Sequence, residues 1–487
     1  AEVIFKMAAT MRRLHICRRS LAYSQKRRSS VVSAERIAVS NDEPNSLYPP
    51  IKSKYPPGTW GAMEPSYAWL WNESREESLA IPDVQQRIAA LCDKEMKQIV
   101  VKVKDVRPRT LDFKKYITKT HVMPGLPEIY QTAVDSSLLD ELTARLSPLI
   151  CDSIAVEMDQ LQRRGYLNHV MKAGNYQESA VAHLLLRTIL CSLSAQLSGQ
   201  FPHLMTLQYD ENVNLAATWD RHGIKRSRRR MVHPEWFTSD IVSDQRVKAN
   251  TSADFVLRSD QPLPEFVSHD SGPSTGTEIP AINFAPHVYG QPMIPKEKST
   301  VEAGYVWGDP SEFGLMSVLN TVWSHYSAEK YGENHAQDAR LGQGVMSSFV
   351  WLAAQAHHQG FNTLVDMTYP LTTQTVLTDG QRWQFLAYQL NTMELWKDNK
   401  GNDRANLCWV SDEAKLYAEV VEGKVHGFNP DVLRHLIAFL ALAPAERPYD
   451  LRPTLPPTGD EPKVREEYIP VKTEEVIVVE EEKYIVE

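Results

Sequence analysis

The sequence predicts an α+β protein with a helical middle region and a C-terminal mixed domain of helix and β-hairpin, flanked by an extended N-terminal arm and a C-terminal tail. Three patterns lead to this fold class: a helical apolar face within 345–356, a hairpin pattern within 373–390, and proline-rich or acidic segments outside them. At 487 residues the chain is long enough for two or three packed units.

The predicted C-terminal domain begins with a buried helix. Five apolar residues recur at the spacing of one helical face, namely Val345, Phe349, Leu352, Ala353 and Ala356. Gly360 follows as a left-handed stop. Leu341-Gly342-Gln343-Gly344, just before this face, superficially resembles a dinucleotide loop, but no strand leads into it and a third glycine is missing.

A β-hairpin is predicted after this helix. Its strands cover 373–378 and 382–390, and Asp379-Gly380 between them favours a type I′ turn. Apolar residues alternate along both faces of the second strand, with Trp383, Phe385 and Ala387 on one face and Leu386, Tyr388 and Leu390 on the other. Both faces of this hairpin are therefore expected to be covered.

Further helices are predicted from spacing and capping residues. Helical spacing occurs in 83–98, 136–147 and 177–198. The last helix has Asn429 as N-cap and Pro430 in its first turn. Its expected buried face is Val432, Leu436, Phe439 and Leu440.

These patterns suggest the following organisation. We expect a transit peptide at 1–34, an arm and N-terminal segment at 35–130, a mainly helical region at 131–260 with a basic loop at 221–230, a proline-rich connection running over the surface at 261–300, the α+β domain at 301–445, and an acidic tail rich in proline and glutamate at 446–487.

The N-terminal segment has the composition of a mitochondrial transit peptide. Residues 7–34 are rich in arginine and serine and contain no acidic residue, and Met7 is the expected start. A disordered basic arm is the alternative. Residues 1–34 carry eight basic and one acidic residue, so the formal charge of −8 for the chain becomes −15 without them. An acidic protein of this kind is expected to meet mainly other proteins and to touch RNA only locally.

The composition also argues against several other classes of protein. The five cysteines form no CxxC pair, which suggests neither a zinc site nor a disulfide framework. The most apolar run, Val181 to Leu197, is interrupted by His183 and Arg187, so it predicts a core helix and no membrane span. No pattern for a metal, a cofactor or a small-molecule substrate stands out.

One basic segment is the best candidate for an RNA contact. Arginine forks suit phosphate oxygens, and clustered basic residues bind them without reading the base sequence. A solvated loop or a contact with an acidic protein is the alternative. The candidate residues are Arg221, Lys225, Arg226, Arg228, Arg229 and Arg230.

A serine hydrolase must also be considered. Ser274 lies in a G-x-S-x-G pattern, and Asp379 and His426 follow in the chain order of a catalytic triad. However, the nucleophile of such enzymes needs a strand before it and a helix after it, whereas prolines at 273 and 280 disfavour both. We therefore expect no catalytic site.

Several segments of the chain resemble the programmed cell death protein 9 family of mitochondrial ribosomal proteins. The segments are 48–51 (YPPI), 116–120 (YITKT), 125–127 (GLP), 353–361, 376–380 (VLTDG), 388–392 (YQLNT), 406–409 (NLCW) and 427–433. The residues that carry the likeness most clearly are Gln355, Gly360, Phe361, Asp379, Gly380, Gln389, Leu390, Asn391, Thr392, Trp409, Gly427 and Phe428.

This resemblance implies a non-enzymatic structural protein of the large mitochondrial ribosomal subunit, although the family has historically been listed with the small subunit. It implies a location in the mitochondrial matrix, with large-subunit rRNA and other ribosomal proteins, including a paralogue, as partners. The paralogue of this family carries an insertion before its last helix. Here Trp409 reaches Gly427 without that insertion, so the chain resembles the programmed cell death protein 9 family more closely than it resembles the paralogue. A regulatory interaction protein outside the ribosome is the remaining alternative, and the resemblance leaves open whether the 389–392 segment packs internally or faces the paralogue.

Overall fold

The computed structural model describes residues 80–82, 97–107, 109–163, 174–225, 242–275, 277, 279–282, 289–291, 293–295, 301–306, 308–363, 365–395, 402–449 and 451. All of them belong to one compact unit, residues 64–487. The expected transit peptide, the arm up to residue 79, residues 83–96 of the helix predicted at 83–98, and the tail from residue 452 lie outside the described residues. The last two residues of that predicted helix, Lys97 and Gln98, belong instead to a strand.

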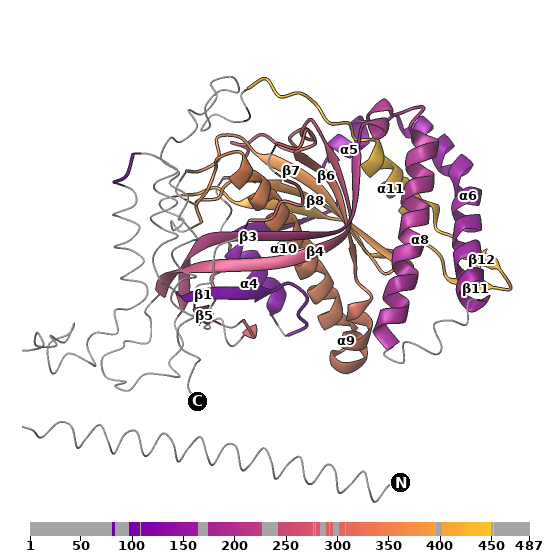
Figure 1. The fold of residues 1–487 in the computed structure, drawn as a ribbon, viewed down its shortest axis with the longest axis horizontal. Coiled ribbons are helices and arrows are strands. Elements are labelled where there is room, and N and C mark those ends of the chain that lie inside the picture. Colours follow the sequence, from indigo (N-terminus) through magenta and orange to yellow (C-terminus); the bar gives the residue numbers. More distant parts are fainter. Residues whose placement is uncertain are drawn as a thin grey trace, which may run out of the picture. The chain divides into compact units, whose positions relative to one another are not determined.

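A ten-stranded mixed sheet forms the middle of the described fold (Figure 1). Its strands are β1 (Lys97–Lys102), β2 (Thr120–Pro124), β3 (Gln208–Lys225), β4 (Val242–Ser259), β5 (Met293–Pro295), β6 (Phe313–Asn320), β7 (Leu371–Thr378), β8 (Arg382–Leu390), β9 (Asn406–Val410) and β10 (Ala414–Lys415). They lie in the order β2-β9-β8-β7-β6-β4-β1-β5, with β3 paired to β4 and β10 to β8. Two further strands, β11 (Glu419–Val421) and β12 (Lys424–His426), pair with each other.

Strand β4 joins the two halves of this sheet. One edge pairs with β3 along nearly its whole length, and the other pairs with β1 at 246–250 and with β6 at 255–259. Because β1 and β6 lie on opposite sides of residue 300 in the sequence, the boundary predicted there does not separate two cores.

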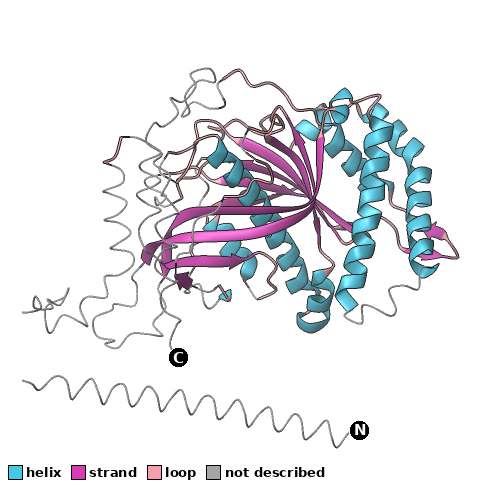
Figure 2. Cartoon of the chain, in the orientation of Figure 1, coloured by secondary structure: helices cyan, strands magenta, loops and turns pink. Residues whose placement is uncertain are grey.

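Helices cover both faces of the sheet (Figure 2). The predicted α+β fold class is confirmed, because most neighbouring strands of the sheet pair antiparallel. On one face lie α4 (Thr110–Ile117) and α10 (Glu333–His358); on the other lie α6 (Ser136–Arg163), α8 (Gly174–Leu197) and α11 (Pro430–Ala441). The other described helices are α5 (Ile129–Thr132), the 3-10 helix η1 (Pro202–Met205) and α9 (Trp323–Tyr331).

The predicted hairpin is formed by β7 and β8, and its two faces lie in different cores. Trp383, Phe385 and Ala387 pack with α11 and α6, whereas Leu386, Tyr388 and Leu390 pack in the core that contains α10. The expectation that both faces are covered is confirmed.

The predicted buried helix is α10, and it begins earlier than its apolar face suggested. Gly360, with φ 90°, follows its end as expected. Gly342 and Gly344 lie inside α10, so they belong to no loop before it. A Cβ on Gly344 would come within 2.6 Å of the Leu386 side chain, which explains why a glycine here lets the helix lie close to the sheet.

In the described part of the middle region the last α-helix ends at Leu197, and only the short η1 follows it. Helix α6 continues through Pro148, because Leu142, Leu146, Ile150 and Ile154 bury one continuous face and packing outweighs the lost hydrogen bond. Helix α8 is long and apolar enough, by length and composition alone, to cross a membrane. Its apolar side nevertheless lies in the core as predicted, through Leu185, Leu186, Ile189, Leu190, Leu193 and Leu197.

The prediction of a mainly helical segment up to residue 260 is wrong from Gln208 onward. Residues 208–225 and 242–259 form the long antiparallel pair β3 and β4. Charged residues obscure the strand pattern there, because they are buried as pairs: Arg246 Nε lies 3.1 Å from Asp220 Oδ1, directly across the two strands. The predicted basic loop therefore begins within a strand.

The last helix, α11, agrees with its prediction. The Asn429 side chain accepts a hydrogen bond of 3.0 Å from the Asp431 amide, as an N-cap does. The expected buried face is confirmed, with at most 2% of Val432, Leu436, Phe439 and Leu440 exposed.

Strand β6 passes directly under Trp351 of α10, where only glycine fits. A Cβ on Gly314 would lie 2.5 Å from the indole ring, which is fully buried and donates to the Ala303 carbonyl. We expect Gly314→Ala to lower the free energy of unfolding by about 1–3 kcal/mol, because a rigid ring must move. Urea unfolding followed by circular dichroism measures this loss. Gly272→Ala, with open space around its Cβ, is the control, and an equal loss in both variants would contradict the packing argument.

Lys114 of α4 is fully buried beneath α10. Its Nζ donates to the Val103 carbonyl, and its side chain lies where a Cβ on Gly342 would come within 3.0 Å. Burial lowers the pKa of Lys114 from 10.5 to about 7, and the nearby Asp105 carboxylate opposes the change only in part.

This buried lysine predicts a pH dependence of stability. Between pH 7 and 10.5 the unfolded chain holds the Lys114 proton and the folded chain does not, so rising pH favours the folded state across this window. In Lys114→Met this part of the slope should disappear, as measured by urea unfolding at several pH values. Lys115→Met, which changes the partly exposed neighbour, should retain it. A Lys114→Met slope equal to that of the natural chain would contradict the assignment.

Candidate functional site

A buried polar cluster joins three of the segments that carry the family resemblance. We call it the polar centre and define it by the side chains of Thr118, Lys119, Thr120, Gln389, Asn391, Thr392 and Asn406, all of which are at most 1% exposed. They come from the end of α4, from β2, from the end of β8 and from the start of β9. The cluster thus lies where the parallel pair of β2 and β9 meets the hairpin.

Asn406 connects two separate backbone segments within the polar centre. Its Oδ1 accepts hydrogen bonds from the amides of Asn391 (2.8 Å) and Thr392 (3.0 Å). Its Nδ2 donates to the carbonyls of Thr118 (2.9 Å) and Thr392 (3.3 Å). All four bonding positions of the side-chain amide are therefore used between backbone groups far apart in the sequence.

Gln389 fastens the proline-rich connection to β8. Its Oε1 accepts from the amides of Phe266 (3.0 Å) and Val267 (3.2 Å), and its Nε2 donates to the Val267 carbonyl (2.9 Å). Because Leu263 and Phe266 are also buried, this part of the connection is anchored in the core and does not run over the surface as expected.

Hydroxyl groups extend the polar centre toward α4. Thr120 Oγ1 lies 2.7 Å from Thr118 Oγ1 and 2.6 Å from the Tyr388 hydroxyl. Burial raises the pKa of Tyr388 well above its usual value. Lys119 has a left-handed backbone, with φ 49°, and its Nζ donates to the Asn402 carbonyl. These bonds show that the 389–392 segment packs internally.

The role of one residue near this site could not be predicted from the sequence. Asp366 caps the chain after β8, accepting from the Met393 amide (2.7 Å) and from Thr392 Oγ1 (2.8 Å). It lies in an irregular segment before β7, so neither spacing nor a motif indicated its role.

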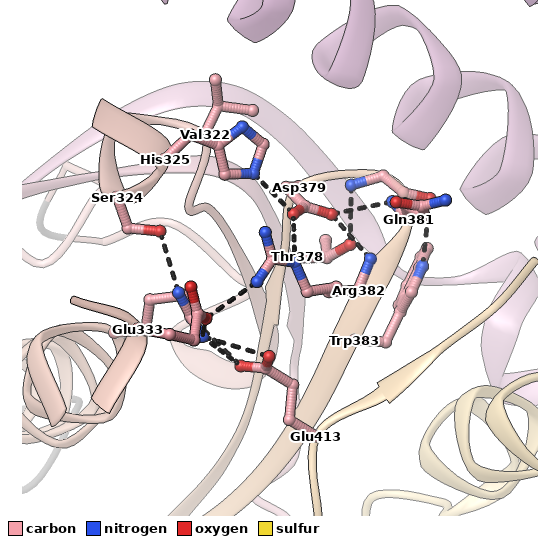
Figure 3. Close-up of polar contacts among 12 residues, drawn as sticks. Val322, Ser324, His325, Glu333, Thr378, Asp379, Gln381, Arg382, Trp383 and Glu413 are labelled. Atoms are coloured by element: carbon pink, nitrogen blue, oxygen red, sulfur yellow. Dashed lines mark hydrogen bonds and ion pairs between the residues drawn. The ribbon is translucent and has the colours of Figure 1, made fainter. Parts of the chain in front are cut away.

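A second polar cluster surrounds the hairpin turn and is shown in Figure 3. Asp379 Oδ1 accepts from the amides of Gln381 (2.9 Å) and Arg382 (2.6 Å), and Oδ2 lies 2.8 Å from His325 Nε2. Of the two predicted turn residues only Gly380 has a positive φ, 95°, so the turn is not type I′. The reason is that the Asp379 carboxylate organises a wider turn by accepting from its backbone.

Charge pairing in the second cluster connects α10 with the hairpin. Burial acts to raise the pKa of Asp379, but hydrogen bonds from His325 and from the amides of Arg382 and Gln381 outweigh it and lower that pKa. Glu333 lies 2.8 Å from Arg382 Nη1 and 2.7 Å from Arg340 Nη2 (Figure 3). The carboxylates of Glu333 and Asp379 are thus paired with arginine side chains of the same cluster.

Most of the remaining residues of the resemblance are buried, whereas Phe428 is half-buried and Gly427 is exposed. Gln355, Phe361 and Trp409 are at most 8% exposed, and Trp409 packs edge-on against Phe266. Gly427 has φ 65°, and a Cβ there would come within 2.7 Å of Ala418. Leu390 is fully buried and Phe428 packs against the core that contains α11.

The three residues considered for a hydrolase do not form a triad. Ser274 is fully buried, and its Oγ contacts Ser271 Oγ (2.9 Å) and Asn391 Nδ2 (3.3 Å). Asp379 bonds to His325, whereas His426 lies in β12. Neither partner of Ser274 can act as a general base. Among the described residues no group of three His, Cys, Asp or Glu side chains could hold a metal ion.

The structure changes the predicted RNA surface at one residue. Arg221 is 4% exposed in β3; its Nε donates to the Tyr116 carbonyl (2.8 Å) and its Nη1 to the Leu395 carbonyl (3.1 Å). A guanidinium used in this way is not available to a phosphate, so Arg221 is removed from the set. Lys225 ends β3, opposite Val242 of β4. Outside the described residues lie Arg226, Arg228, Arg229 and Arg230.

The polar centre yields a stability prediction. Asn406→Asp replaces two donated hydrogen bonds by contacts between a buried carboxylate and the carbonyls of Thr118 and Thr392. We expect a loss of about 3 kcal/mol or more in the free energy of unfolding, measured with urea. Asn429→Asp is the matched control, because that side chain only accepts a hydrogen bond and aspartate is an equally good N-cap. Similar small losses in both variants would refute the role given to Asn406.

Comparison with known proteins identifies the family. Over residues 7–444 the sequence matches the family described as mitochondrial 28S ribosomal protein S30 (PDCD9). It is similar to the large ribosomal subunit protein mL37 of Rattus norvegicus, with 23% identity over 313 residues, or 62% of each chain. The mL37 proteins of Mus musculus and Gallus gallus are 23% and 24% identical over 49% and 51% of this chain and 52% and 54% of their own.

The alignments thus span less than two thirds of the length of each of these relatives. The family match is broader: it covers most of this chain and includes every segment that contributes to the polar centre and to the hairpin cluster. The chain belongs to the family of mitochondrial 28S ribosomal protein S30 (PDCD9).

Proposed function

We propose that this chain is a structural, non-enzymatic component of the mitochondrial ribosome and acts in its large subunit. Membership of a ribosomal protein family over residues 7–444 is the observation that carries this proposal. The family description refers to a 28S protein, whereas the relatives are named as large-subunit proteins, and the latter support the choice of subunit.

The geometry of the fold supports a structural role. Residues of the resemblance are used inside the molecule, where side-chain amides, hydroxyls and charges bond to one another and to backbone groups. An active site would instead present such groups, with convergent geometry, to a substrate. These residues therefore act as the internal framework of an assembly protein, and neither a cofactor nor a small-molecule substrate is part of the proposal. A hydrolase using Ser274 and a regulatory role outside the ribosome gain no support from this geometry.

Contact with large-subunit rRNA is assigned to the basic segment Lys225–Arg230. Lys225 lies at the end of the ladder between β3 and β4, opposite Val242. The pairing of β4 with β1 begins only at Arg246, opposite Gln98, so the end of this ladder extends beyond β1. Basic side chains at the end of a long two-stranded ladder can reach phosphates while the acidic body stays at a distance.

The remaining parts of the chain are assigned to delivery and to protein partners. Residues 1–34 direct the chain to the mitochondrial matrix as a transit peptide. The proline-rich arm and the acidic tail contact other ribosomal proteins, among them a paralogue, since segments of this composition gain order from a partner.

Sedimentation tests the proposed function. After gradient centrifugation of a mitochondrial lysate, we expect this chain to migrate with large-subunit rRNA, and to shift together with that particle when subunits are dissociated from each other. If the chain stays at the top of the gradient while the rRNA migrates as a particle, the proposed function is wrong.

A charge reversal tests the RNA contact. Replacing Arg228, Arg229 and Arg230 by glutamate should reduce incorporation into particles and make it more sensitive to salt, because phosphate contacts are lost. The control variant replaces the exposed residues Lys104, Lys415 and Lys424 by glutamate, which changes the net charge equally. Equal incorporation of the two variants would show that the basic segment is merely solvated.

A further inference from the structure

Strand β2 is the last strand on its side of the sheet. It pairs in parallel with β9 along Thr120–Pro124, and no other described strand pairs with it. Residues 121–123 are half-buried, so the outer edge of β2 is close to the surface. An edge of this kind offers backbone donors and acceptors to another strand.

The direction of these backbone groups follows from two hydrogen bonds. The Asn406 amide donates to the Lys119 carbonyl (2.9 Å), and the Gly125 amide donates to the Val410 carbonyl (2.8 Å). In a parallel ladder alternate residues of one strand bond to the same neighbour. Lys119, His121, Met123 and Gly125 therefore face β9, whereas the amide and carbonyl of Val122 point outward. In the described part of the chain this outward pair has no partner.

An apolar groove of about 650 Å³ begins where β2 ends. The floor of the groove is formed by Trp383 and Phe385 of β8. Leu126 and Pro127, which follow β2 after Gly125, line one part of the groove, and Val432 of α11 lines another. A peptide that binds along the outer edge of β2 would thus place its next apolar side chains in this groove.

The charge of the groove indicates the chemistry of its occupant. Asp412 and Asp431 are exposed at its lining and form no ion pair with any described residue. Arg434, the one arginine of the lining, is already paired with Asp140. An occupant with basic residues therefore complements the groove. The acidic tail of this chain does not, since residues 460–487 carry ten acidic and four basic residues.

We infer that the outer edge of β2 and the adjoining groove bind an extended, basic segment of a neighbouring ribosomal protein, which adds to the sheet as a further strand. Backbone bonds to Val122 give the affinity, and the groove selects apolar side chains next to basic ones. This inference rests on the proposed function and names a class of partner and a binding surface for it.

Hydrogen exchange tests the inference without any substitution. Mass spectrometry of peptides containing Val122 compares the isolated full-length chain with purified mitochondrial large subunits. The Val122 amide should exchange readily in the isolated chain and at least about tenfold more slowly in the particle, because an added strand accepts its hydrogen bond.

Substitutions at the edge and in the groove give a second readout. Val122→Pro removes the outward N–H but none of the bonds to β9, and proline is tolerated where an edge-strand N–H faces solvent. It should leave the melting temperature close to that of Val122→Ala and reduce incorporation into particles at least about tenfold, whereas Val122→Ala, which keeps the N–H, should incorporate normally. Asp412→Lys should weaken incorporation through charge alone.

The possible outcomes separate this inference from the proposed function. If the chain is absent from particles, the proposed function fails and the inference with it. If the chain is present but the Val122 amide exchanges as fast as in the isolated protein, only the inference is overturned. It is also overturned if the isolated chain already protects this amide and deletion of residues 460–487 removes the protection, because the tail would then be the occupant.

Discussion

The bonding of Asn406 is the constraint on which the rest of the structure depends. One side-chain amide satisfies backbone groups of the segment after α4 and of the segment after β8, while its own residue begins β9. Buried polar groups are costly unless they are bonded, so this arrangement specifies one mutual placement of three segments. Gln389 and Asp366 extend the same principle to the proline-rich connection and to the chain after β8. The two apolar cores supply most of the buried surface. The polar centre fixes how the segments after α4 and after β8 lie relative to β9.

The use of these polar side chains for internal hydrogen bonds explains why the best-matched segments contain no recognisable catalytic or binding motif. The polar residues that resemble the family are mostly used for internal bonding, and the carboxylates near the hairpin turn are paired with arginines. The surfaces proposed for partners lie at the periphery of the fold. The end of the β3 and β4 pair carries basic residues, while the outer edge of β2 adjoins an acidic, apolar-floored groove. An assembly protein needs a well-packed interior and contact surfaces at the edges of the fold.

Local patterns predicted the elements whose burial is regular along the sequence. The apolar face of α10, the two faces of β8 and the cap of α11 were all readable in this way. The β3 and β4 pair was missed because Asp220 and Arg246 interrupt its apolar alternation, and they are tolerated only because they face each other across the strands. The segments of the polar centre stood out by resemblance, but their contacts could not be predicted: Thr118 and Asn406 are 288 residues apart, and a lone asparagine gives no sign of its partners. The burial of Arg221 likewise depends on carbonyls of distant residues.

Native-state hydrogen exchange at Asn391 and Thr392 tests the central claim most directly. The amides of both residues donate to Asn406, and the account predicts that they exchange only when the whole fold opens. Their opening free energy, measured at increasing denaturant, should therefore equal the global free energy of unfolding and fall with the same slope. Exchange of these two amides by a local opening much cheaper than global unfolding would contradict the claim that the polar centre holds the fold together.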